Sequence, residues 1–231
     1  YYRDIYDLLS LAVVSTYNQI EYGIYTNKDY GNVRGLELKL DYSLDNLFIQ
    51  TNYTYQFTRG NADNPSQTFS RQGSSIDKVI RFIPMSWDQR HTFNVSLGYN
   101  TSKYGITSTG YYNSGTPYTF SPQGESNLAL LNLYPNNDYK PSNYTIDLTG
   151  YLNLPKIFGY QPNLNLLMRN ITDRRNEYGV SSETGRSYTA VVNETELLSH
   201  RSDFNSYEDR YQDPSMFSSP REIKVGLTIK F

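Results

Sequence analysis

The 231-residue sequence contains no cysteine, one tryptophan and only two histidines. Without cysteine there is no disulfide framework, no cysteine-type zinc site and no thiol chemistry. The histidines, His91 and His200, lie far apart in the sequence, and one histidine supplies only one metal ligand. The common hydrolase, metalloprotease, phosphate-loop and calcium-loop motifs do not occur. We therefore expect no catalytic residue, no metal and no cofactor, and the chain is not predicted to be an enzyme.

Long hydrophobic runs are also missing. The chain has no run of about eighteen apolar residues, which excludes a transmembrane helix. Its mean hydropathy of -0.65 is typical of a soluble protein, but a transmembrane β-barrel gives the same average because apolar and polar residues alternate. The net charge is -2, and no basic cluster is interleaved with aromatic residues, so nucleic acid is not an expected partner.

Tyrosine is abundant, with 24 residues. Tyrosine favours β-strands and membrane–water interfaces, and it also suits loops that bind sugars. Its abundance alone does not decide between these roles.

The last segment, Arg221–Phe231, alternates strictly between apolar and polar or small residues. Its apolar members are Ile223, Val225, Leu227, Ile229 and Phe231. Successive side chains of a strand point to opposite faces, so this pattern predicts a strand with one apolar face and one polar face.

Similar alternation predicts about eight strands along the chain. They are Tyr1–Leu9, Ile20–Tyr42, Leu47–Phe57, Trp87–Tyr99, Tyr104–Asn113, Asn143–Leu154, Asn163–Thr172 and Arg221–Phe231. The polar segment Ser10–Asn18 is predicted to be a turn. Within the second strand, Asn27–Asn32 is either a turn or a bulge, and we prefer a bulge because it keeps the number of strands even.

The connections after the second strand alternate between short and long. In chain order they are Leu44–Asn46, Arg59–Ser86, Asn100–Lys103, Ser114–Ser142, Pro155–Gln161 and Asp173–Pro220. In an up-and-down sheet, every second connection lies at the same end, so the short turns gather at one end and the long loops at the other. Outer-membrane barrels show this asymmetry, and strands of about 9–11 residues cross a bilayer. The predicted fold is all-β, an antiparallel up-and-down transmembrane barrel.

In such a barrel the polar residues of each strand point into the lumen, where their charges stay hydrated or pair with other groups. The charged residues that we assign to this face are Glu37, Lys39, Asp88, Arg90, Asp147 and Arg169.

Several segments resemble the TonB-dependent outer-membrane receptors, in a tyrosine- and asparagine-rich style similar to that of the Bacteroidetes. YYRDIYDLL resembles an ascending strand of that family, and NVRGLELKLDYSL resembles its Asn…Gly-Leu-Glu strand through Asn32, Gly35, Leu36 and Glu37. SWDQRHTFNVSLGY, SGTPYT and NLNLLMRNITDRRNEYG resemble later strands and loops, and Gly185-Arg186 resembles part of the last loop. The likeness covers nearly the whole chain, 1-231, but only the C-terminal third of the family barrel.

The resemblance implies a 22-stranded barrel around a plug domain, with this chain supplying the C-terminal strands of a longer receptor. It also implies a multi-pass β-barrel in the outer membrane of a Gram-negative bacterium, which takes up a scarce nutrient such as a siderophore, vitamin, glycan or peptide with energy delivered through TonB. Expected partners are outer-membrane lipid, the TonB complex, the plug domain and the barrel-assembly machinery, for which Phe231 resembles the recognition signal. The long loops are expected to contact the nutrient. The candidate contact residues are Tyr118, Tyr134, Tyr139, Arg186, Tyr188, Tyr207 and Tyr211.

Three other hypotheses remain open from the sequence. The chain is a self-contained eight-stranded outer-membrane barrel that acts as an adhesin or small channel, an outer-membrane enzyme that uses loop acids, or a soluble tyrosine-rich sandwich that binds carbohydrate. No pair of acids in Asp173–Pro220 is singled out by its spacing.

Overall fold

The computed structural model of the chain describes residues 1–15, 21–65, 82–121, 134–156, 158–188 and 214–230. Antiparallel strands dominate these ranges, so the predicted all-β class and up-and-down order are confirmed. No helix within them is long and apolar enough to cross a membrane.

One nine-stranded sheet carries most of the described chain, and eight of its strands follow one another in the order β1-β2-β3-β5-β6-β9-β10-β11. They are β1 (Tyr2–Ser15), β2 (Glu21–Leu44), β3 (Leu47–Gly60), β5 (His91–Asn100), β6 (Tyr104–Asn113), β9 (Asn143–Asn153), β10 (Gln161–Arg169) and β11 (Glu222–Lys230). The short strand β4 (Ile83–Pro84) pairs with the end of β3. A separate two-stranded sheet joins β7 (Pro117–Tyr118) to β8 (Asp138–Tyr139), and one 3-10 turn spans Pro214–Met216.

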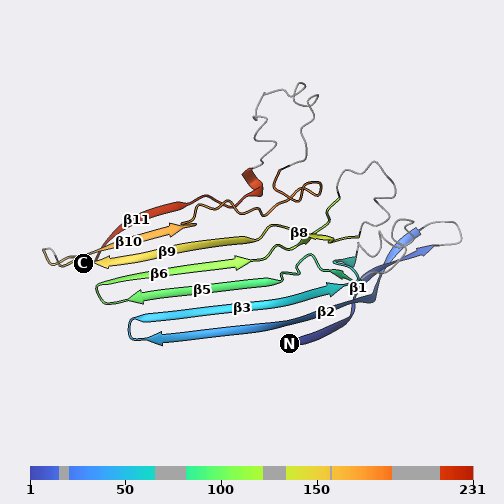
Figure 1. Ribbon diagram of the computed structural model, residues 1–231, viewed down its shortest axis with the longest axis horizontal. Helices are drawn as coiled ribbons and strands as arrows, with labels where there is room; N and C mark the ends of the chain where they lie inside the picture. Colours follow the sequence, from blue (N-terminus) through green and yellow to red (C-terminus); the bar gives the residue numbers. More distant parts are fainter. Residues whose placement is uncertain (16–20, 66–81, 122–133, 157, 189–213, 231) are drawn as a thin grey trace, which may run out of the picture.

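The sheet is open in the described residues, with β1 and β11 as its two edges (Figure 1). The short turns lie at one end of the sheet and the long connections lie at the other (Figure 1). This sorting agrees with the predicted connection lengths.

The β2–β3 turn is tight because Asp45 adopts a left-handed φ of 49°. The β5–β6 turn is closed by Thr101, whose Oγ1 accepts the backbone N–H of Tyr104 at 3.0 Å.

The predicted bulge in the second strand is confirmed. Strand β2 runs unbroken through Asn27–Asn32, but its register against β1 shifts twice in this region, between Ile5 and Leu8 and between Leu8 and Leu9. An extra residue enters first on β1, where Asp7 has a left-handed φ of 59°, and then on β2. The two irregularities compensate for each other, so the pairing continues to Ser15.

Two predicted boundaries are wrong by four residues or more, and the other strand ends differ from the prediction by at most three, as where the strand predicted over Asn163–Thr172 ends at Arg169. The segment predicted as a turn, Ser10–Asn18, is strand as far as Ser15, because the run from Leu11 to Val14 pairs in register with β2. The strand predicted to begin at Trp87 begins at His91 instead. Trp87 lies in a turn, which the backbone N–H of Asp88 closes by donating to the carbonyl of Met85 at 2.8 Å.

The two faces of the main sheet differ in chemistry. Residues that pair directly across neighbouring strands share a face, and the register aligns Leu38 with Tyr53, Tyr53 with Phe93 and Phe93 with Tyr112. The same face continues across β9, β10 and β11, where Ser108 pairs with Leu148, Leu148 with Met168 and Met168 with Ile223. Large apolar side chains on this face are exposed, with Leu38 at 56% and Leu227 at 60%. The opposite face carries polar residues, so among the described residues the sheet has one exposed apolar face and one polar face.

The buried interior of the described residues lies among the long connections and the parts of the strands next to them. Its hydrophobic members are Ala62, Ile83 and Met85. Most buried side chains there are polar, and they include Asp29, Asp88, Asn136, Asn170, Asn176 and Glu177. The organised part of the loops is therefore held mainly by hydrogen bonds.

Candidate functional site

The polar face of the sheet forms a hollow of about 450 Å³ over strands β2, β3, β5, β6 and β9. The polar side chains around it come from Lys39, Asp41, Gln50, Asn52, Asn94, Ser96, Thr109, Tyr111 and Asp147. Lys39 Nζ lies 2.9 Å from Asp41 Oδ2, and both side chains are exposed to solvent. The hollow is lined by donors and acceptors from many strands and by charges of both signs.

Four of the six charged residues assigned to the polar face lie on it. Glu37 and Lys39 stand in register with Thr54 and Asn52 of β3. Asp147 of β9 accepts the backbone N–H of Asn170 at 2.8 Å, and Arg169 of β10 lies 3.4 Å from Glu222 of β11.

The other two, Asp88 and Arg90, lie before β5 in a cluster at the long-loop end. Asp88 is fully buried, and its Oδ1 accepts the backbone N–H of Thr58 at 2.6 Å. Its Oδ2 accepts Arg90 Nε at 2.7 Å and the hydroxyl of Tyr139 at 3.0 Å. One carboxylate therefore joins β3, the segment before β5 and the β7–β8 hairpin.

Arg90 completes this cluster through its guanidinium plane. The group lies 4.1 Å from the ring centroid of Phe57 and 5.4 Å from that of Tyr139, to whose hydroxyl Nη2 also donates at 2.7 Å. Burial and the adjacent Asp88 carboxylate raise the pKa of Tyr139. The predicted ligand-contact residue Tyr139 thus has its hydroxyl bound to both Asp88 and Arg90 within the protein.

A second set of bonds ties two long connections to each other. Asn136 is buried, and its Nδ2 donates to Asp63 Oδ2 at 2.6 Å and to the carbonyl of Pro84 at 2.9 Å. Asn61 Nδ2 donates to Asp29 of β2 at 2.7 Å. The described parts of the connections after β3 and β6 are therefore organised as one unit.

The connection after β10 is anchored by an ion pair and a buried amide. Arg186 Nε lies 2.9 Å and 3.1 Å from the two carboxylate oxygens of Glu177, which also accepts the backbone N–H of Ser187 at 2.7 Å. Burial alone would raise the pKa of Glu177, but the hydrogen bonds from Arg186 and Ser187 outweigh it and lower that pKa. Arg186, a predicted ligand-contact residue, is thus held by Glu177, although half of its side chain remains exposed.

Asn176 performs a structural role that sequence reasoning missed. Its side chain is 1% exposed, accepts the backbone N–H of Tyr144 at 3.0 Å and donates to the carbonyl of Tyr144 at 2.9 Å. The Asn176 amide therefore pairs with both backbone groups of Tyr144, as a neighbouring strand would. The asparagines of NITDRRNEYG were a signal for such bonding, because asparagine amides pair readily with backbone groups.

The other predicted contact residues are placed as follows. Tyr118 of β7 donates its hydroxyl to Asp138 Oδ2 at 3.2 Å, and burial together with that carboxylate raises the pKa of Tyr118 to about 12. The ring of Tyr188 lies 5.8 Å from the Arg186 guanidinium. Tyr134 is half-buried. Tyr207, Tyr211, Phe231 and His200 lie outside the described residues.

His91 begins β5 and contacts two tyrosines of β3. The hydroxyl of Tyr53 lies 2.8 Å from its Nδ1, and the ring of Tyr55 lies 4.9 Å away. Within the described ranges, no group of three histidine, aspartate or glutamate side chains is placed to hold a metal ion.

Comparison of the chain with models of known protein families finds no match, and no functionally curated protein matches it.

Proposed function

We propose that the chain is part of the wall of an outer-membrane β-barrel, and that the complete barrel is a TonB-dependent receptor that imports a scarce nutrient. The observation that carries this proposal is the distribution of side chains on the apolar face. Aromatic residues lie near both ends of this face and aliphatic or small residues lie between them.

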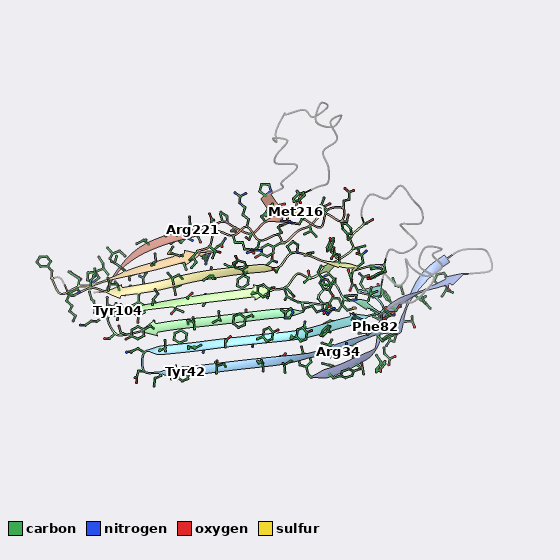
Figure 2. The ribbon with its side chains drawn as sticks, viewed as in Figure 1. Arg34, Tyr42, Phe82, Tyr104, Met216 and Arg221 are labelled. Atoms are coloured by element: carbon green, nitrogen blue, oxygen red, sulfur yellow. The ribbon has the colours of Figure 1, made fainter. Side chains whose placement is uncertain are left out.

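One aromatic row lies at the short-turn end and is formed by Tyr42, Tyr99, Tyr104 and Tyr160. Figure 2 labels Tyr42 and Tyr104 at this end. The second row lies toward the long loops and is formed by Tyr53, Phe93, Tyr112 and Tyr144. Between Tyr104 and Tyr112 the same face of β6 carries only Ile106, Ser108 and Gly110. Eight residues of strand rise about 26 Å, or about 20 Å when the strand is tilted.

This arrangement fits the apolar band of outer-membrane barrels, which is about 25 Å tall with aromatic girdles at both interfaces. Soluble monomers rarely expose a contiguous apolar surface of this extent to water. A soluble carbohydrate-binding sandwich would cover the face with a second sheet, which the described residues do not provide. The polar hollow on the other side then faces the lumen.

The receptor assignment rests on the family resemblance and on the two sheet edges. In hydrocarbon, unpaired backbone groups are costly, so a spanning sheet has to close. Neighbouring strands from the rest of a larger, 22-stranded barrel would satisfy β1 and β11. The hydrogen-bonded loops at the long-loop end would then form part of the outer surface that captures the nutrient, and the plug would fill the lumen against the polar face.

The size of the native polypeptide tests this proposal. An antibody against the tail Arg221–Phe231 is applied to isolated outer membranes. We expect a band several times heavier than the 26.7 kDa of this chain. A band near 26.7 kDa that shifts on boiling, as intact barrels do, would instead favour a self-contained eight-stranded adhesin or small channel. Recovery only in the soluble fraction would contradict both membrane hypotheses.

A further inference from the structure

A second pocket lies on the apolar face at the long-loop end, away from the polar hollow. It measures about 390 Å³ and is formed by β1, β2, β3 and Phe82. Its polar side chains are Asp4, Asn32, Arg34 and Arg59. Figure 2 labels Arg34 and Phe82, which lie at the end opposite Tyr42 and Tyr104.

The two arginines are placed on the same face as the aliphatic band. Arg34 lies two residues beyond Leu36, and its cross-strand partner is Phe57. Arg59 lies two residues beyond Phe57, opposite Asn32. Because strand side chains alternate, both guanidinium groups emerge just outside the apolar band. In the proposed barrel, this is the level of the lipid head groups of the outer leaflet.

The positive charge of this pocket is not neutralised by the described part of the chain. Arg34 and Arg59 are exposed, and neither forms an ion pair with a described carboxylate. The guanidinium of Arg34 lies 5.3 Å from the ring centroid of Phe57. The one carboxylate in the pocket, Asp4, accepts Asn32 Nδ2 at 2.6 Å. Two cations against one anion leave the pocket positive.

Aromatic side chains form the walls. Tyr30 and Phe82 are stacked with ring centroids 5.6 Å apart, and Tyr2 and Tyr6 are 67% and 71% exposed. Such rings suit the boundary between lipid and water, where one end of the side chain is apolar and the other is polar. The pocket therefore joins an apolar surface to two guanidinium groups that have no ion-pair partner among the described residues.

We propose that this pocket binds the phosphoryl head group of a lipid in the outer leaflet. Arginine is suited to phosphate because its planar group donates two parallel hydrogen bonds to the oxygens. Basic pockets beside apolar membrane surfaces bind phosphorylated head groups in the same way. This inference rests on the proposed function, because only a barrel in the membrane brings the apolar face into contact with lipid.

The test uses the complete native protein, purified from outer membranes in mild detergent, and native mass spectrometry of the phosphorylated lipid that it retains. The variant Arg34→Gln/Arg59→Gln removes both guanidinium groups. The matched control Lys39→Gln/Arg169→Gln removes two cations from the polar face. Loss of two charge-assisted contacts is expected to lower lipid retention by about tenfold or more, while the control stays close to the wild type. Equal retention in the pocket variant would overturn the proposal.

Two further measurements separate other outcomes. The variant Arg34→Lys/Arg59→Lys keeps the charge but loses the bidentate geometry, so retention intermediate between the wild type and the glutamine variant supports phosphate recognition. Binding of millimolar inorganic phosphate by a wild-type protein that retains no phosphorylated lipid would show a site for free phosphate and overturn the lipid assignment. The heat-dependent gel shift is recorded for every variant. A membrane-embedded, heat-shifting protein with unchanged lipid retention contradicts only this inference, whereas a soluble protein contradicts the proposed function itself.

Discussion

The Asp88 carboxylate links several segments of the chain at the long-loop end. It is fully buried and accepts hydrogen bonds from Thr58, Arg90 and Tyr139. These three residues lie in separate parts of the sequence. The buried carboxylate is satisfied by a cation and two further donors. Removing it leaves the half-buried Arg90 without a counter-ion and the backbone N–H of Thr58 without this acceptor.

We predict that Asp88→Ala destabilises the folded protein by about 3 kcal/mol, which is typical of breaking a buried ion pair by removing one partner. Asp88→Asn should cost less, because the amide oxygen still accepts the N–H of Thr58. Urea-induced unfolding of the complete protein in lipid measures both values. Asp41→Asn is the control, since Asp41 forms an exposed pair with Lys39. Equal effects at the two positions would contradict the role of Asp88.

We predict that Glu177 holds the connection after β10 in place, and that this stabilisation depends on pH. Hydrogen bonds from Arg186 and Ser187 lower its pKa in the folded state, so the carboxylate stabilises the loop at every pH above its ordinary value of about 4.3. This stabilisation is lost as the pH falls through the lowered folded-state pKa. Limited proteolysis of the connection after β10 should therefore be constant from neutral pH to about pH 5 and increase below about pH 4.

Glu177→Gln provides the comparison for that experiment. The variant cannot ionise, so its loop should be cleaved faster at neutral pH, and its rate should change little in the acidic range. If wild type and variant show the same pH profile, Glu177 is not the group that anchors this connection.

At the scale of single strands, β5 allows a direct test of which face meets lipid. Leu97 lies on the apolar face and is 44% exposed, whereas its neighbour Ser96 lines the polar hollow. Both lie between the aromatic residues Phe93 and Tyr99, near the middle of the expected membrane span. Leu97→Arg should cost about 2–4 kcal/mol of stability in a bilayer, whereas Ser96→Arg should cost little because the lumen is hydrated.

Unfolding of both variants in lipid vesicles measures this difference. If Ser96→Arg proves the more costly, the assignment of the two faces is reversed. Equal effects would show that neither face contacts hydrocarbon.

The strands were the most predictable elements, because a period of two is visible in the sequence wherever one face is apolar. Strand β6 matches its predicted bounds, Tyr104–Asn113. The failures are at the ends of elements. Ser10 looked like the start of a turn, yet pairing with β2 continues to Ser15. Trp87 fitted the alternation of β5, but the bonds of Asp88 turn the chain there.

The hydrogen-bonded clusters were not predictable from alternation. Asn176, Asn136 and Asp88 act through partners that are far away in the sequence, such as Tyr144, Asp63 and Thr58. Only the folded sheet brings these groups together, and single-residue propensities carry no information on which distant donor will pair with which acceptor. The two arginines of the pocket on the apolar face were missed for the same reason, since Arg34 and Arg59 become neighbours only through the β2–β3 register.

For the whole molecule, the two sheet edges distinguish a segment of a large barrel from a small closed one. A self-contained eight-stranded barrel requires β1 to pair with β11. A large barrel places further strands beside each of them. Because this chain contains no cysteine, introduced cysteine pairs report on this contact. Directly paired residues lie about 4.5–5.5 Å apart at Cα, which a disulfide can bridge.

We therefore expect no disulfide between Arg3→Cys of β1 and a cysteine placed in turn at four polar-face positions of β11. Those positions are Glu222, Lys224, Gly226 and Thr228. The control pair Asn163→Cys/Thr228→Cys joins β10 to β11 in register and should cross-link under the same oxidising conditions. Mass spectrometry of peptides from the complete protein in outer membranes identifies the bonds. A β1–β11 disulfide at any of these positions would mean that eight strands close the barrel, because no larger barrel brings these two edges within reach of each other.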